Sequence, residues 1–291
     1  MPNTIALAQK YVPMLDEVYK LSSVTAVLDG APELVSQGAN ANELIIPMMT
    51  MSGLADYNRN SGYVAGDVTM TNETVKCNFD RGRSFVVDTM DDIETAGLAF
   101  GRLAGEFIRT KVTPELDAFR FASYAGKEGI SKNTAQLTDG ASVIEALRAA
   151  VNKFDEDEVP LDQRHLFITP TLLGMVQDLD TIKSREVLQN FASIQKVPQT
   201  RFYTAIEQKD GKTSGEESGG YAKAADAKDI GFMLIHKPAL IQYEKHVAPK
   251  IITPEQNQNA DAYIFGYRNV GIADAYKNKL AGIYMHINAA S

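Results

Sequence analysis

The sequence predicts an α+β fold, and three observations lead to this class. Residues 75–79 and 84–87 place apolar side chains at every second position, which is the pattern of half-buried strands. Residues 88–124 carry an apolar stripe at helical spacing over about 50 Å, longer than an ordinary helix. The later strands and helices do not alternate strictly, as they would in a parallel sheet, and this favours α+β.

Composition and charge exclude several functional classes. Of the 291 residues, 44% are hydrophobic and 23% are charged, as in a globular protein. The net charge of −8 argues against a surface that clamps nucleic acid. No run of about 20 apolar residues is long enough for a transmembrane helix, and the first 15 residues lack the features of a signal peptide. Cys77 is the single cysteine, so the chain forms no internal disulfide and suits a reducing compartment.

The first part of the chain is predicted to be an arm and a hairpin. Residues 1–39 contain a short amphipathic pattern broken at Pro13, with too little apolar surface to fold alone. The apolar run 44–51 contains a proline, which confines it to a sheet edge or a bulge. Between this run and the strand at 75–79 lies a polar, turn-rich stretch, residues 56–67. A two-stranded hairpin is marginally stable in isolation, so we expect this one to pack across another chain.

The helical stretch 88–124 is predicted to be the spine of the fold. Phe100, Phe107 and Phe121 lie on one line at multiples of seven residues, which predicts a buried helix face. Pro114 occupies the remaining position on this line and should kink the helix or end its first segment. Negative charge at a helix start suits the helix dipole and capping. The acidic residues at this start are Asp88, Asp91, Asp92 and Glu94.

The second half is predicted to contain shorter elements. Ser142 and Glu145 form a capping-box pattern, which predicts a helix to about residue 154. Pro170 opens a further helix after a buried strand. Beyond these, we expect a helix at 184–193, strands at 165–169, 201–206, 231–236, 241–253, 262–276 and 278–288, and loops at 131–140 and 209–229.

The sequence contains no pattern that predicts a catalytic site. Residues 211–213 (Gly-Lys-Thr) imitate the end of a phosphate-binding loop, but Ile206 stands where that motif needs glycine, which favours a solvated loop. The four histidines are scattered without metal-ligand spacing. No serine lies in a Gly-x-Ser-x-Gly frame. The acidic residues at 88–94 are explained by the helix start.

Two passages carry a resemblance to a known family. RSFVVDTMDDIETAGLAFGRLAGEFIRTKVTPELDAFRF (residues 83–121) resembles the hairpin-to-spine passage of tailed-phage major capsid proteins. GFMLIHKPALIQYEKHVAPKIITPEQNQNADAYIFGYRNVGIADAYKNKLAGIYMHI (residues 231–287) resembles their C-terminal passage of a buried strand, a polar turn and paired long strands. The order of arm, hairpin, spine helix and late α+β domain is also similar, so the resemblance implies the Hong Kong 97-type shell fold.

The resemblance implies four parts: an N-terminal arm (1–39), an extended loop (40–87), a peripheral domain (88–140 and 241–291) and an axial domain (141–240). It implies a structural protein without cofactor or catalysis, which assembles with itself into hexamers and pentamers of an icosahedral shell around phage DNA. The implied partners are a separate scaffold protein, a portal and a decoration protein. A separate scaffold protein is expected because this chain starts directly at the arm. The implied location is the virion head, assembled in the bacterial cytoplasm.

The resemblance leaves details and alternatives open. Some relatives crosslink a lysine to an asparagine, but no such pair is matched here, so we expect noncovalent assembly. The alternatives are an encapsulin-like nanocompartment shell and, in a different class, a soluble acidic enzyme with an unrecognised site. Exposed aromatic and charged residues near the hairpin and spine are candidate inter-subunit contacts: Tyr57, Arg59, Tyr63, Arg81, Arg83, Asp91, Asp92 and Glu94.

Overall fold

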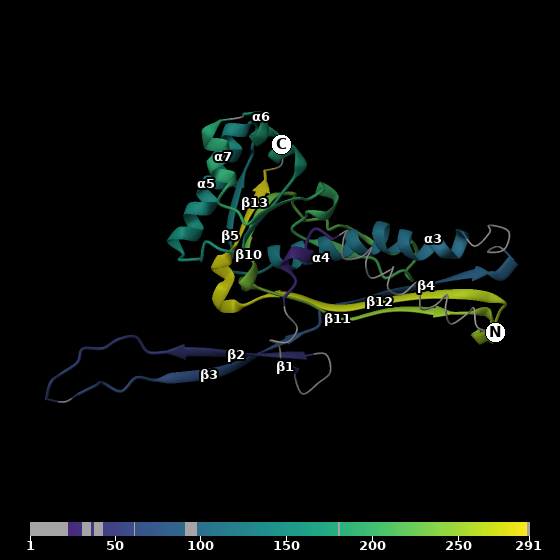
Figure 1. Cartoon of the computed structure of the whole chain (residues 1–291), viewed down its shortest axis with the longest axis horizontal. Helices are drawn as coiled ribbons and strands as arrows, with labels where there is room; N and C mark the ends of the chain where they lie inside the picture. Colours follow the sequence, from purple (N-terminus) through teal and green to yellow (C-terminus); the bar gives the residue numbers. More distant parts are fainter. Residues whose placement is uncertain are drawn as a thin grey trace.

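A computed structural model describes residues 23–30, 36–37, 43–60, 62–90, 98–179 and 181–289. Two bodies of structure meet at the spine helix, and a long hairpin projects to one side (Figure 1). One body is a long three-stranded sheet with the spine lying along it, and the other is a five-stranded sheet covered by helices. This mixture of helices and separate sheets is the predicted α+β class.

The elements of the described chain are as follows. The helices are α3 (Leu98–Phe107), the π-helical segment η3 (Ile108–Val112), α4 (Thr113–Ala125), α5 (Gly140–Glu156), α6 (Pro170–Asp178) and α7 (Ile182–Leu188), with short 3-10 turns at Ala26–Leu28, Gln199–Arg201, Lys237–Ala239, Pro254–Gln256 and Lys277–Gly282. The strands are β1 (Ser36–Gln37), β2 (Glu43–Met51), β3 (Val68–Lys76), β4 (Phe79–Asp88), β5 (Ser131–Ala135), β6 (Arg164–Ile168), β7 (Ser193–Lys196), β8 (Ile206–Gln208), β9 (Tyr221–Lys223), β10 (Ile230–His236), β11 (Leu240–Ile252), β12 (Ala262–Ala275) and β13 (Ile283–Asn288).

The predicted hairpin is formed by β2 and β3. Their antiparallel register runs from Glu43 opposite Lys76 to Met51 opposite Val68. Pro47 lies opposite Asn72 of β3, beyond the two residues of β2 that pair with β1 in the described part of the chain. The edge position expected for a proline in a strand stays a prediction.

The strand pattern at 75–87 divides into two elements. β3 ends at Lys76, and β4 begins at Phe79 and pairs along its length with β12 of the long sheet. The sheet order is β11-β12-β4, with both pairs antiparallel. β4 therefore belongs with the last long strands of the chain, not with the hairpin.

The spine crosses Pro114 without a break in its helical path. The five residues of η3 form a wider π-helical turn ahead of the proline, where Thr113 donates its backbone N–H and its hydroxyl (3.0 Å) to the carbonyl oxygen of Ile108. A wider turn accommodates the proline ring and its missing donor. The first α-helical segment thus ends before Pro114, as predicted, and α4 continues from there.

The spine packs on the long sheet through an apolar core. Ile108 and Leu116 of the spine and Phe265 of β12 are buried in this core. Phe107 is half-buried beside it, and its ring lies edge-on against Phe85 with centroids 4.8 Å apart. The apolar stripe read from the sequence therefore faces the sheet.

Replacing Phe107 by aspartate is expected to destabilise the subunit by about 2–4 kcal/mol, because a charge would enter this aromatic contact without a partner. The measurement is chemical denaturation of the unassembled subunit. Phe107→Leu is the control and should cost less than about 1.5 kcal/mol. If the aspartate variant matched the wild type in stability, the ring would contribute nothing to the core.

The second sheet has the order β5-β13-β10-β6-β7. β10 is buried throughout and pairs antiparallel with both β13 and β6, which confirms the buried strands predicted around residues 165–169 and 231–236. The helices α5, α6 and α7 cover one face (Figure 1). Pro170 begins α6, as predicted.

Several local predictions were wrong. The stretch predicted as a loop from residue 131 begins with β5, an edge strand of the second sheet that pairs in parallel with β13. Helix α5 is capped by Asp139, whose carboxylate accepts the N–H of Ser142 at 3.0 Å, so Ser142 is not the cap. The strand predicted at 201–206 is a turn at 199–201 followed by the short β8, which pairs with β9 in a two-stranded sheet. The strands β12 and β13 lie in different sheets.

Candidate assembly surface

The base of the hairpin is anchored to the body of the subunit. Ile46 and Val75 are buried in a small core with Ile241 and Ile272 at the start of the long sheet. The Glu73 carboxylate lies 3.0 Å from the Lys277 ammonium. The hairpin therefore leaves the body at a fixed point.

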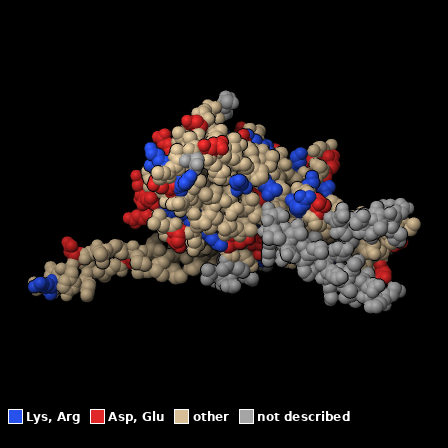
Figure 2. Space-filling model, turned by 45° about the horizontal axis from the view of Figure 1, so that its top comes forward, with Lys and Arg blue, Asp and Glu red and all other residues tan. Residues whose placement is uncertain are grey.

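Beyond its base, the hairpin exposes a stripe of apolar side chains. Met49 lies opposite Met70 and Met51 opposite Val68, and directly opposed side chains of an antiparallel pair share one face. All four are exposed, Met51 to 68%. Residues 44–55 contain no charged side chain, and Figure 2 shows few charged groups along this projection. Such an exposed apolar strip marks an interaction surface.

The tip of the hairpin (residues 52–67) carries an aromatic pair. The rings of Tyr57 and Tyr63 lie edge-on with centroids 4.9 Å apart, and Tyr63 is 90% exposed. Asn58 and Gly62 pair through two backbone hydrogen bonds, which close the turn between the tyrosines. Leu54 is fully exposed beside them. The tip is a polar turn that carries exposed aromatic and aliphatic side chains, and no other described part of its own chain covers them.

Arg81 of β4 lies at the junction of the two bodies. Its Nε donates to the Glu115 carboxylate of α4 at 2.8 Å, and its Nη2 donates to the backbone oxygen of Lys209 at 2.7 Å. Burial raises the pKa of Glu115, and the charge and hydrogen bond of Arg81 oppose this shift. Arg81 thus ties β4 to the spine and to the loop before β9.

Arg83, two residues further on the same strand, binds the same loop. Its two terminal nitrogens donate to the backbone oxygens of Ser218 (3.0 Å) and Glu217 (2.8 Å). Gly219 has φ +63, and a Cβ there would lie 2.7 Å from the Arg83 guanidinium, so glycine suits this close approach. The loop that the sequence predicts at 209–229 is therefore bound by two arginines.

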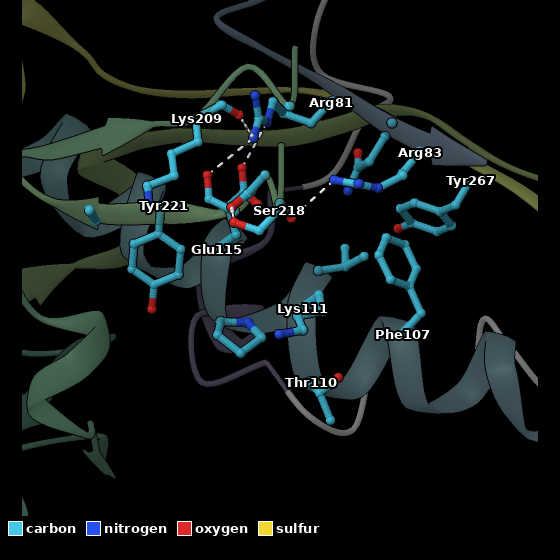
Figure 3. A pocket seen from close by; sticks show the side chains of 18 of the residues that line it. Arg81, Arg83, Phe107, Thr110, Lys111, Glu115, Lys209, Ser218, Tyr221 and Tyr267 are labelled. Carbon is cyan, nitrogen blue, oxygen red and sulfur yellow. Dashed lines mark hydrogen bonds and ion pairs between the residues drawn. The ribbon is translucent and has the colours of Figure 1, made fainter. Parts of the chain in front are cut away.

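A groove of about 840 Å³ lies between this loop, the spine and β4. Figure 3 shows Phe107 and Tyr267 at one side, Arg81, Arg83 and Ser218 above, and Thr110 and Lys111 projecting from the spine below. Its lining is both apolar and charged. The cations are Arg81, Arg83, Lys111, Lys209 and Lys223, and the carboxylates are Glu106, Glu115 and Asp210.

The root of the N-terminal arm is held by a buried charge network. The Asp117 carboxylate of α4 accepts hydrogen bonds from the hydroxyls of Ser23 and Thr25, both 2.7 Å, and lies 3.1 Å from Arg201. Asp117 is fully buried, and so is Thr25. A buried carboxylate is stable only when its oxygens are paired.

A second arginine and a glutamine extend this network to the long sheet. Arg120 donates to the Thr25 hydroxyl and to Glu244 of β11, both at 2.8 Å. Gln242 donates to the backbone oxygen of Thr25 at 2.8 Å and accepts from the Tyr124 hydroxyl at 2.6 Å. Residues 23–30 are therefore fixed between spine and sheet, although the sequence assigns them to an arm that cannot fold alone.

The structure shows the surroundings of the residues that the sequence analysis considers for metal binding and phosphate binding. Among the described residues, no group of three or more His, Cys, Asp or Glu side chains converges as metal ligands would. At the Gly-Lys-Thr stretch, Asp210 already accepts the backbone N–H groups of Lys212 and Thr213, and these bonds lower its pKa to about 2. Burial lowers the pKa of His165, as it does for His236 and His286. In this part of the chain, no helix is long and apolar enough to cross a membrane.

The predicted contact residues fall into three groups. Tyr57, Arg59 and Tyr63 lie exposed at the hairpin tip. Arg81 and Arg83 already make bonds inside the subunit, so their role between subunits stays a prediction. Three further candidates lie outside the described residues: Asp91, Asp92 and Glu94.

The apolar stripe along the hairpin was not among the predicted contacts. Its members are Met49, Met51, Val68 and Met70, with Leu54 and Val64 near the tip. The signal was present in the sequence, since the run 44–51 is apolar on both faces of a hairpin expected to lie on another chain.

Comparison with solved structures identifies the fold. Neither a protein-family model nor the sequence of a curated protein matches the chain. A chain from Gordonia phage Cozz matches with a TM-score of 0.61 at 12% identity, over 93% of this chain and 87% of that one. A chain of the bacteriophage PhiM1 mature capsid matches with a TM-score of 0.56 at 12% identity, over 86% of this chain and 83% of that one. A chain of a virus-like particle from Pyrococcus furiosus matches with a TM-score of 0.53 at 11% identity, over 95% of this chain and 99% of that one. The chain therefore has the phage-capsid shell fold that the sequence predicts.

Proposed function

We propose that this chain is the major capsid protein of a tailed bacteriophage, whose copies assemble into the icosahedral head shell around the phage DNA. The observation that carries the proposal is the long hairpin, which exposes an apolar stripe and an aromatic tip on a subunit with the shell fold. An exposed apolar surface of this kind marks a contact with another chain. The role is structural, and the subunit works through contacts with its own copies.

The four-part division follows the same proposal. The arm comprises residues 1–39, the extended loop 40–87, the peripheral domain 88–140 and 241–291, and the axial domain 141–240. The strand pairings support two adjustments: Phe79–Asp88 goes with the peripheral sheet and Ile283–Asn288 with the axial sheet. The hydrogen-bonded part of the extended loop is then β2 and β3.

The acidic charge of the subunit supports a shell around DNA. A net charge of −8 keeps the protein from binding phosphates at high density, so packaged DNA is enclosed without being held. Further partners in this proposal are a scaffold protein, a portal and a decoration protein, and assembly takes place in the cytoplasm of the bacterial host.

The test is electron microscopy of particles formed by the purified full-length chain, with or without a co-expressed scaffold protein. We expect closed icosahedral shells. A chain that stays monomeric under all assembly conditions would contradict the proposal. If ladders of multimers survived boiling in detergent, the noncovalent assembly expected here would be wrong.

A bacterial nanocompartment shell is the second candidate, because the Pyrococcus furiosus virus-like particle matches over 99% of its length. The contents of particles from the native source distinguish the two. Double-stranded DNA supports the phage shell, and an enclosed enzyme supports the nanocompartment.

A further inference from the structure

Three exposed methionines share one face of the hairpin. Met49 and Met51 of β2 and Met70 of β3 are 54%, 68% and 64% exposed. Met49 lies directly opposite Met70, and Met51 follows Met49 by two positions on the same strand, so the three side chains point to one side. We propose that these three residues, the methionine cluster, form a peroxide-sensitive modification site whose oxidation prevents assembly, an inference that rests on the shell function proposed above.

The other face of the hairpin has a different chemistry. Thr50 lies opposite Thr69, and Met48 lies opposite Thr71. The three threonines are exposed, and Met48 is half-buried. Three hydroxyl groups beside one thioether make this the more polar face. The methionine cluster therefore lies on the face that is better suited to an apolar contact with another chain.

Exposure separates the cluster from most other methionines of the described chain. Met233 of β10 and Met285 of β13 are buried, with 0% and 1% exposure. Met90, two residues after β4, is 60% exposed but lies outside the hairpin. A peroxide must reach the sulfur in order to react. In the free subunit, the cluster and Met90 should therefore be oxidised ahead of the buried pair.

The proposed reaction transfers one oxygen atom from a peroxide to each sulfur. A lone pair of the thioether sulfur attacks one peroxide oxygen, a bond forms between sulfur and oxygen, and the O–O bond breaks. With hydrogen peroxide, the other oxygen takes up the proton of the transferred oxygen and leaves as water. Each sulfur is oxidised by two electrons, and each peroxide is reduced by two. The product, methionine sulfoxide, is polar where the thioether was apolar and flexible.

Oxidation changes the hairpin surface most strongly when another chain covers it. A sulfoxide oxygen is a hydrogen-bond acceptor, and burial of an acceptor without a donor is unfavourable. A thioether sulfur is only a weak acceptor and is buried readily. Three sulfoxides on one face would place three such acceptors in the contact. Free subunits with an oxidised cluster should therefore stay out of the shell, and a cluster already covered in a shell should be protected.

The experiment treats the purified full-length chain with hydrogen peroxide before assembly. A dithiothreitol wash then returns disulfides of the single cysteine, Cys77, to the thiol. Peptide mass spectrometry measures the oxygen taken up at each methionine, and electron microscopy with size-exclusion chromatography measures shells. We expect full oxidation of the cluster to raise the subunit concentration needed for half-maximal assembly by at least about tenfold. Methionine sulfoxide reductases for both sulfoxide epimers should restore assembly.

Two sets of leucine substitutions separate the cluster from other oxidation sites. The triple variant Met49→Leu, Met51→Leu and Met70→Leu keeps the apolar volume and removes the oxidisable sulfurs, so it should assemble and withstand peroxide. Met90→Leu is the matched control, because it removes a methionine of similar exposure outside the hairpin. It should remain as sensitive as the wild type. Melting temperatures confirm that both variants fold.

A competition within the wild type needs no variant. Subunits that are oxidised only in part are allowed to assemble, and shells are separated from the unassembled fraction. Sulfoxide at Met49, Met51 and Met70 should be depleted in the shells, whereas sulfoxide at Met90 should be equal in both fractions. When complete shells are treated instead, the cluster should take up oxygen at least about tenfold more slowly than in free subunits, because covered sulfurs are out of reach.

The outcomes distinguish this proposal from the shell function. Normal shells from subunits with a fully oxidised cluster would overturn the proposal and leave the shell function intact. Equal peroxide sensitivity in the triple variant, or equal sulfoxide content of the cluster in shells and unassembled subunits, would do the same. Absence of shells from the untreated wild type under all assembly conditions would count against the shell function itself.

Discussion

A subunit that lacks residues 57–63, with a short Gly-Ser link in their place, should fold normally and form no closed shells. The hairpin base stays anchored, because Ile46 and Val75 remain packed on Ile241 and Ile272. What is lost is the aromatic knob, which contributes nothing to the core of its own subunit within the described residues. In an interface, a few aromatic anchors carry most of the binding energy.

The measurement is paired: thermal unfolding reports the subunit, and electron microscopy with size-exclusion chromatography reports assembly. We expect a melting temperature within a few degrees of the wild type and a soluble species well below shell size. The control replaces Lys212 and Thr213, in the exposed loop 209–223, by Gly-Ser. It tests whether a change in an exposed loop by itself impairs assembly, and it should leave assembly intact. Normal closed shells from the deletion variant would refute the role of the tip.

Replacing Asp117 by alanine should produce the second large effect, a loss of about 3–5 kcal/mol in the free energy of unfolding. The substitution leaves the buried Arg120 and Thr25 in a network that has lost its central carboxylate, and it removes the partner of Arg201. Asp117→Asn keeps the shape and part of the hydrogen bonding, so its cost should be smaller, about 1–3 kcal/mol.

Two measurements distinguish this network from a general core defect. Chemical denaturation gives the loss in stability, and limited proteolysis followed by mass spectrometry shows whether cleavage near residues 23–30 becomes faster. Asp178→Ala, an exposed carboxylate on α6, is the control and should change stability by less than about 0.5 kcal/mol. Unchanged proteolysis and stability in Asp117→Ala would show that the network does not hold the arm root.

These predictions differ in how far the sequence supports them. The tip deletion follows from sequence patterning, because a polar turn between two strands with no core of their own already predicts a hairpin that needs another chain. The prediction for Asp117 does not follow from sequence patterning. Asp117 lies in the middle of an amphipathic helix, and its partners at Ser23 and Thr25 are more than 90 residues away.

The same distinction explains the errors in the second half of the chain. The residues of β5 carry no strand pattern, and they become a strand because β13 offers them an open edge. Asp139 caps α5, although Ser142 and Glu145 match the capping-box pattern equally well. Local patterns are degenerate in such cases, and the final choice depends on the packing of the whole domain.

The sequence by itself determined the α+β class, the hairpin, the spine across Pro114 and the buried strands β6 and β10. These features depend on periodicity and on the restricted backbone of proline, which act over a few residues. Only the tertiary structure decided that β12 and β13 lie in different sheets, that Arg81 and Arg83 bind the loop 209–223, and that a groove lies beside the spine. Those features depend on pairings between residues far apart in the sequence, such as Arg81 with Lys209, where no local pattern specifies the partner.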